Sequence, residues 1–213
     1  LSSSRVQQLR LRLFSTPLEP IFSALFAYPN VVIFQGLRTL CALALLALPM
    51  DRPEAVGFLA AGLVLTHILL CLRSQFGWDG ADQMMAIVLS AVACANFLPT
   101  PFMRNVALAF ITAQALLAYL SAGLWKAVSP VWRKEPALVS VLATRSYGAP
   151  ALASILFRAP TLGIALGWMV FCWEIAFPAV LFVPSTWMWY ILASGAAFHL
   201  ANAAVMGLNT FFW

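Results

Sequence analysis

The strongest constraint on this chain is a series of apolar runs, each about as long as a lipid bilayer is thick. A helix needs about 20 predominantly apolar residues to cross the hydrocarbon core. Six segments approach that length: residues 31–50, 55–73, 84–99, 106–125, 161–183 and 186–208. They are apolar on all faces, whereas strands of a membrane barrel alternate apolar and polar residues. The sequence therefore predicts an all-α, polytopic transmembrane helix bundle of about six spanning helices.

Composition excludes a water-soluble fold. Of the 213 residues, 63% are hydrophobic and 9% are charged, whereas soluble domains carry about 25% charged residues. A soluble domain of this size could not hide so much apolar surface. The net charge of +5 comes mainly from basic residues in loops and at helix ends, where orientation and anionic lipid headgroups explain them. Membrane lipids are the expected surroundings, and nucleic acid is not an expected partner.

Prolines mark the turns between neighbouring spans. The segments Pro49–Pro53 and Pro99–Pro101 separate the first two pairs of spans, and Pro184 with Ser185 separates the last pair. Ser185 is the expected cap of the final helix. Such short connections predict antiparallel neighbours.

Two segments differ from the spans. Residues 1–30 begin with arginines alternating with aliphatic residues, which is typical of an amphipathic helix lying in the membrane interface. Residues 126–160 are mixed in polarity, and within them we expect one or two short interfacial or re-entrant helices over residues 136–158. The sequence predicts a single membrane domain over residues 1–213, with the helix bundle over 31–208.

Lysine and arginine predict the orientation of the bundle. With the N-terminus in the cytoplasm, all basic residues except Arg52 and Arg104 fall on or near the cytoplasmic side. We therefore expect an N-terminus in the cytoplasm, and a bacterial inner membrane as the location.

Two charged residues in the spans are candidates for chemistry. Glu174 lies in the middle of the fifth span, and Pro178 leaves its carbonyl without a helical hydrogen-bond partner. It is either a carboxylate that handles protons or substrate, or a protonated or paired carboxyl group that locks two helices together. Lys126 ends the fourth span, where a lysine normally reaches the headgroups. Beside apolar walls it could instead act as a base.

Uncharged polar residues form a second set of candidates. His199 and Asn202 share one face of the last span, and His199 could contact Glu174 on the preceding antiparallel helix. Interhelical hydrogen bonding is the alternative role for them. The same structural role is favoured for His67 in the second span.

The remaining ligand-type residues do not indicate a metal site. Asp79 and Asp82 lie in a glycine-containing turn, and one or the other is expected to cap the third span. The cysteines lie in or at the ends of apolar runs without a CxxC pair, and the expected role of these residues is packing. The sequence thus assigns no metal ligands.

Several segments in order resemble the vitamin K-dependent γ-carboxylase family, which shares the horizontally transferred transmembrane domain. The segment AYLSAGLWKAVSPVWRK, residues 118–134, is similar to a family motif of the form Y-x-x-A-G-x-x-K-L followed by Trp. Similar stretches in the same order are FQGLRTLCALALL, GWDGADQMM, WEIAFPAVLF and FHLANAAVMGLNTFFW. Together they cover nearly the whole chain.

The resemblance implies that Lys126 is a base that deprotonates a quinol cofactor such as vitamin K hydroquinone. In the family, oxygen then yields a strong base that removes a γ-proton from a peptide glutamate, and CO2 adds. Glu174 and His199 would be pocket residues. Weaker candidates for contacts with the cofactor are Asn202, His67 and Trp125.

Two other functions compete with an enzyme that binds a quinone or another lipid-soluble cofactor. The chain could be a non-catalytic subunit of a larger membrane protein complex, binding lipid or pigment. Small residues over 193–197 permit the close helix packing that this requires. A small transporter or immunity-type protein is the third reading, but the scarcity of charges within the spans argues against an ion-coupled carrier.

Overall fold

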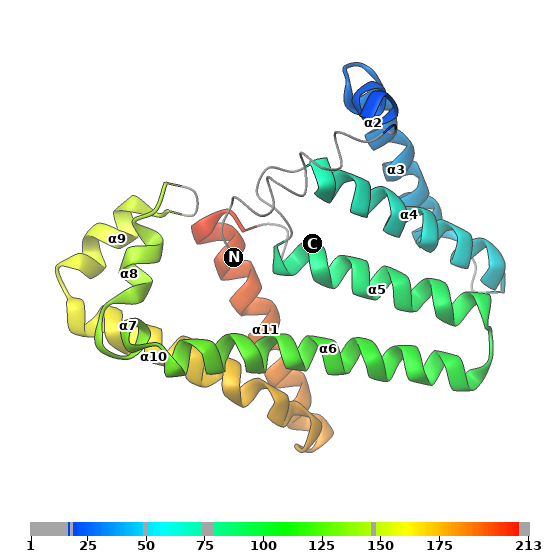
Figure 1. Cartoon of the computed structure of the whole chain (residues 1–213). Helices are drawn as coiled ribbons and strands as arrows, with labels where there is room; N and C mark the ends of the chain where they lie inside the picture. Colours follow the sequence, from blue (N-terminus) through cyan, green and yellow to red (C-terminus); the bar gives the residue numbers. More distant parts are fainter. Residues whose placement is uncertain (1–16, 18, 49–50, 74–78, 146–147, 209–213) are drawn as a thin grey trace. The chain divides into compact units, whose positions relative to one another are not determined.

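The computed structural model describes residue 17 and residues 19–48, 51–73, 79–145 and 148–208. These residues are helical almost throughout, as the sequence predicts (Figure 1). Contacts divide the chain into two compact units, residues 1–111 and residues 112–213. The boundary falls within one helix, α6, and each unit is described by itself.

The described residues of the first unit are almost all helical. Its elements are α2 (Glu19–Phe26), α3 (Asn30–Ala47), α4 (Pro53–Arg73), α5 (Gly80–Phe97) and the start of α6 (Pro101–Val128). Helix α4 packs against α3 on one side and, more extensively, against α5. Small side chains permit the close approach of α4 and α5: Ala60 of α4 and Ala91, Ala93 and Ala95 of α5 are all buried.

The second unit continues from α6 through short helices into the last two long ones. Its further elements are α7 (Pro130–Lys134), α8 (Ala137–Leu142), α9 (Pro150–Phe157), α10 (Pro160–Ala176), a 3-10 turn (Phe177–Leu181) and α11 (Ser185–Met206). One apolar cluster joins α8 to α9 through Val139, Leu142 and Leu156. A second cluster joins α6 to the 3-10 turn through Leu116 and Phe177.

The predicted all-α bundle of six spanning helices is confirmed. The helices that are long and apolar enough to cross a membrane are α3, α4, α5, α6, α10 with its 3-10 extension, and α11. Several begin a few residues before the predicted spans, because Pro53, Pro101 and Pro160 occupy their first turns. Proline favours this position, where its missing N–H has no intrahelical partner to lose.

Large apolar side chains cover the outside of these helices, as expected of a multi-pass integral membrane protein. In α3, none of the 18-residue apolar window is buried by protein, and in α11 only 6% is buried. Side chains such as Leu46 and Leu65 are exposed by 85% and 60%. Water would penalise so much apolar surface, whereas lipid solvates it.

The segments between the spans bear out one prediction and correct another. Helices α8 and α9 are the short helices expected over residues 136–158. The predicted capping role of Ser185 is wrong, because Pro184 occupies the N-cap position and Ser185 is the first helical residue. Most of the amphipathic segment predicted over residues 1–30 lies outside the described residues, apart from α2 and the turn after it.

Candidate functional site

A buried ion pair joins α6 to α10 in the second unit. Lys126 Nζ donates to both carboxylate oxygens of Glu174, at 2.7 Å each. The Glu174 side chain is 6% exposed and that of Lys126 is 22% exposed. The ammonium also lies 5.4 Å from the ring centroid of Trp132, within the range of a cation–π contact. Bonds of this length between two charged groups are among the strong ones, especially away from water.

A glycine on α6 brings the two helices close enough for this pair. A Cβ atom at Gly123 would lie 2.9 Å from the backbone nitrogen of Ile175 and 3.0 Å from Cβ of Glu174. Any larger residue would therefore push α6 away from α10. Lys126 follows Gly123 by three residues, which places it on the same face of the helix. The Gly–Lys spacing thus sets the lysine against the carboxylate.

The backbone of α10 changes just beyond Glu174. The α-helix ends at Ala176, and the chain continues as a 3-10 turn over Phe177–Leu181 that contains Pro178. Proline has no N–H to donate to the carbonyl four residues earlier. The sequence predicts that Pro178 leaves the Glu174 carbonyl without a helical hydrogen-bond partner, and the change of helix type at this point agrees with that prediction.

A second polar contact lies two turns earlier on α6. Tyr119 Oη and His199 Nε2 are 2.6 Å apart and link α6 to α11. The Tyr119 ring also contacts Trp173 edge-on and lies against Phe177. Trp173 Nε1 donates to Ser194 Oγ at 3.1 Å, which adds a link from α10 to α11. Aromatic rings and hydrogen bonds therefore hold three helices together beside the ion pair.

The structure brings some of the predicted site residues together and separates others. Lys126 and Glu174 form a direct pair, and His199 bonds to Tyr119. Asn202 lies one turn further along α11 and is half-buried. Trp125 is 76% exposed, next to Lys126 in sequence but on another face of α6.

The sequence predicts no role for Tyr119 or Trp173, and it includes Ser194 only among the small residues over 193–197 that permit close helix packing. Tyr119 stands in the segment that carries the family resemblance, which was the available signal. The other two look like ordinary members of an apolar span, and only their packing identifies them as part of the site.

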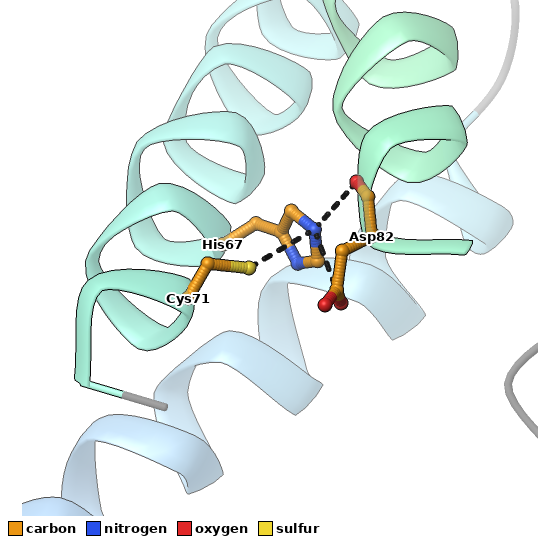
Figure 2. A group of neighbouring side chains, drawn as sticks. All are labelled: His67, Cys71 and Asp82. Carbon is orange, nitrogen blue, oxygen red and sulfur yellow. Dashed lines mark hydrogen bonds and ion pairs between the residues drawn. The ribbon is translucent and has the colours of Figure 1, made fainter. Parts of the chain in front are cut away.

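The first unit has a polar cluster of its own, drawn in Figure 2. His67 and Cys71 of α4 point toward Asp82 of α5. His67 Nε2 lies 2.9 Å from the Asp82 carbonyl oxygen, 3.7 Å from Asp82 Oδ1 and 3.6 Å from Cys71 Sγ. On the other side of the ring, Arg38 Nη2 of α3 lies 3.2 Å from Nδ1. Both His67 and Cys71 are buried.

The start of α5 fixes Asp82 in this cluster. Asp79 is the N-cap: its side chain accepts from the backbone N–H of Asp82 at 2.8 Å. In return, Asp82 Oδ2 accepts from the backbone N–H of Asp79 at 3.4 Å. Of the two predicted alternatives, Asp79 is therefore the cap of the third span, and Asp82 completes the capping box from the third helical position.

Comparison of the chain with models of protein families, with curated proteins and with solved structures finds no match. The function is therefore inferred from the geometry of the two clusters and from the sequence motifs.

Proposed function

We propose that this multi-pass membrane protein is a module of the γ-carboxylase-like type that binds a quinone, or a similar lipid-soluble cofactor, with Lys126 as base. The observation that supports this proposal best is the buried pair between Lys126 and Glu174. The order of the sequence motifs along the chain gives the cofactor class.

A charged pair within an apolar helix bundle is expensive to maintain. Each ion loses its hydration, and attraction between the two ions often does no more than offset that loss. Ionisable groups inside membrane segments therefore commonly have functional roles. Among the described residues, Lys126 and Glu174 form the one ion pair between a lysine and a glutamate. Because this pair is largely buried, it carries that desolvation cost.

Glu174 gives Lys126 a route to the neutral amine that a base requires. If the proton on Lys126 Nζ moves along the 2.7 Å contact to Glu174, an ion pair becomes two neutral groups. A surrounding of low polarity favours the neutral groups more than water does. The free amine can then accept a proton from the hydroxyl of a quinol, while Glu174 retains the first proton.

Flat apolar side chains near the pair suit the ring of such a cofactor. Trp132 lies against Lys126, and Tyr119, Trp173 and Phe177 pack together on the neighbouring turns. Aromatic rings favour offset or edge-on contacts with other rings. A quinone ring can use these contacts without a network of hydrogen bonds.

The test uses the full chain in lipid nanodiscs with vitamin K hydroquinone as probe. Quenching of tryptophan fluorescence measures binding, and oxygen consumption measures oxidation of the quinol. We expect Lys126→Ala to lower turnover by about 100-fold or more, since a positioned base contributes about that much. Glu174→Gln should also lower turnover, because an amide cannot take the proton.

The matched control is Lys134→Ala, which removes an exposed lysine of α7 in the same unit. Its turnover should equal that of the native chain. Full turnover in Lys126→Ala would exclude Lys126 as the base. Absence of quinol binding by the native chain would exclude this cofactor class.

The second candidate function is a non-catalytic subunit of a larger membrane protein complex that binds lipid or pigment. The observation in its favour is α11, where Ala193, Ala196 and Ala197 are exposed and small. Small residues allow a partner helix to approach closely. Purification in mild detergent distinguishes the two: a stoichiometric membrane protein partner supports this function, and a bound quinone without a partner supports the first.

We also propose an orientation with the N-terminus in the cytoplasm of a bacterium, in its inner membrane. The basic residues support this, since only Arg52 and Arg104 would lie outside. A membrane-impermeant maleimide applied to intact cells should label Asp51→Cys and not Glu135→Cys, both at exposed turn positions. The reverse pattern would reject this orientation.

A further inference from the structure

We propose that His67, Cys71 and Asp82 form a binding site for one zinc ion between α4 and α5. The three side chains offer one imidazole nitrogen, one sulfur and one carboxylate oxygen, all within 4.8 Å of one another (Figure 2). This inference concerns the first unit and is independent of the quinone proposal.

The positions of the three groups follow from the helices that carry them. His67 and Cys71 are four residues apart on α4, so their side chains lie on one face, one turn from each other. Asp82 occupies the first turn of α5, where the capping box uses its Oδ2 and leaves Oδ1 directed toward His67. The site therefore belongs to two helices that already pack together.

The two separations from His67 Nε2 to the other ligand atoms are close to those of a tetrahedral zinc site. Bonds of about 2.0 Å to nitrogen or oxygen and about 2.3 Å to sulfur place two tetrahedral ligands roughly 3.3 to 3.6 Å apart. Cys71 Sγ lies 3.6 Å from His67 Nε2, and Asp82 Oδ1 lies 3.7 Å from the same nitrogen. Small movements of the Asp82 side chain would complete the geometry. Three protein ligands leave a fourth position for water or another small ligand.

Ligand type and charge point to zinc rather than to magnesium or calcium. Thiolate and imidazole ligands favour zinc, whereas magnesium and calcium prefer oxygen ligands. A thiolate and a carboxylate together carry two negative charges, which balance Zn²⁺. The complex would then be neutral, which suits a site at the end of a membrane helix.

Without metal, the same residues form a hydrogen-bonded chain with a defined proton position. Arginine can only donate, so Arg38 Nη2 donates to His67 Nδ1, and Nε2 then carries the proton that it donates to the Asp82 carbonyl. Zinc binding requires the opposite tautomer, with the proton on Nδ1. Binding therefore releases the thiol proton of Cys71 to solvent, moves the imidazole proton and turns Arg38 away from the ring.

Zinc and Arg38 favour opposite tautomers of His67. This competition distinguishes a metal site from a hydrogen-bonded network with a purely structural role. The full chain in mild detergent is titrated with Zn²⁺ by calorimetry, and with Co²⁺ as a spectroscopic probe. We expect one equivalent of metal and a near-ultraviolet charge-transfer band from cobalt bound to thiolate. Cys71→Ser and His67→Gln should each weaken Zn²⁺ binding by at least about 100-fold.

Arg38→Gln should strengthen binding, because an amide oxygen can accept the Nδ1 proton that the metal-bound histidine presents. Cys94→Ser is the matched control, since Cys94 is an exposed cysteine on α5. It should leave both the affinity and the cobalt band unchanged.

Two results would overturn the proposal. One is the absence of stoichiometric Zn²⁺ binding by the native chain when circular dichroism shows it to be folded. The other is retention of native affinity in Cys71→Ser, because the site has no other sulfur ligand among the described residues. The quinol assay on Lys126 gives an independent answer in either case.

Discussion

The two units bury polar side chains in different ways. In the second unit, full charges of opposite sign meet, and a glycine sets the distance between their helices. In the first unit, a histidine lies between an arginine and an aspartate, with a cysteine beside it. The ion pair of the second unit suits proton transfer to or from an apolar molecule, whereas the cluster of the first unit offers a set of metal ligands.

This difference shows two ways in which polar side chains are stabilised inside a membrane protein. In an ion pair, two charges stabilise each other. Removal of one partner leaves the other as an uncompensated buried charge, which is strongly destabilising. In a hydrogen-bonded chain that ends on a helix cap, several groups share the hydrogen bonds that the buried polar atoms need. We therefore expect substitutions in the ion pair to have larger effects on stability than substitutions in the cluster of the first unit.

The largest effect should follow from splitting the ion pair. Lys126→Met leaves Glu174 buried without its cation and should lower the free energy of unfolding by about 3 kcal/mol or more. The double variant Lys126→Met with Glu174→Leu should recover much of that loss, because no charge remains buried. Denaturation in mixed micelles measures both values. Equal stabilities of the single and double variants would show that the carboxylate is accommodated without Lys126.

The next effect concerns the glycine that sets the distance between α6 and α10. Gly123→Ala should destabilise the second unit by about 1 to 3 kcal/mol, because the new methyl group would overlap the backbone at Ile175. The matched control is Gly62→Ala in α4, where nothing lies within 4 Å of the added Cβ. There, the better helix propensity of alanine should stabilise the helix by up to about 1 kcal/mol. Changes of the same sign in both variants would contradict the close approach at Gly123.

The helix cap of the first unit should have a smaller effect. Asp79→Ala removes the side chain that accepts from the Asp82 N–H, and should cost about 1 kcal/mol. Asp79→Ser keeps an acceptor and should restore most of that stability. Because the cap orients Asp82, Asp79→Ala should also weaken Zn²⁺ binding, by up to about tenfold. Loss of stability in the serine variant equal to that in the alanine variant would argue against the capping box.

The smallest effect should come from the hydroxyl of Tyr119. Tyr119→Phe keeps the ring contacts and removes only the contact with His199, so it should cost about 0.6 kcal/mol. Tyr190→Phe, at an exposed tyrosine of α11, is the control and should change nothing measurable. A loss above that of Asp79→Ala would place the hydrogen bond among the dominant interactions of the second unit.

The sequence predicts the helices well, because each spanning helix corresponds to one continuous apolar run. The long apolar runs and the prolines at Pro53, Pro101 and Pro160 mark where the helices lie, and the observed bounds differ from the predicted spans by a few residues at either end. The capping role of Asp79 is equally local and was predicted correctly. Ser185 has a residue type that favours the N-cap, but Pro184 occupies that position and Ser185 is the first helical residue.

The candidate sites depend on contacts that sequence alone does not record. Lys126 and Glu174 stand out as charges in apolar runs, but their pairing spans 48 residues and requires the approach at Gly123. The partner of His199 is 80 residues away. The sequence does not reveal the cluster of the first unit, because a histidine and a cysteine on one helix meet an aspartate of the next only after α4 and α5 pack.

The most direct test of the two roles is native mass spectrometry of the intact chain released from mild detergent. The native chain should carry one zinc ion and one quinone-sized apolar molecule. Cys71→Ser should lose the metal alone, and Gly123→Leu, which separates α6 from α10, should lose the apolar molecule alone. Loss of both in either variant, or a native chain that carries neither, would contradict the assignment of separate chemistry to the two clusters.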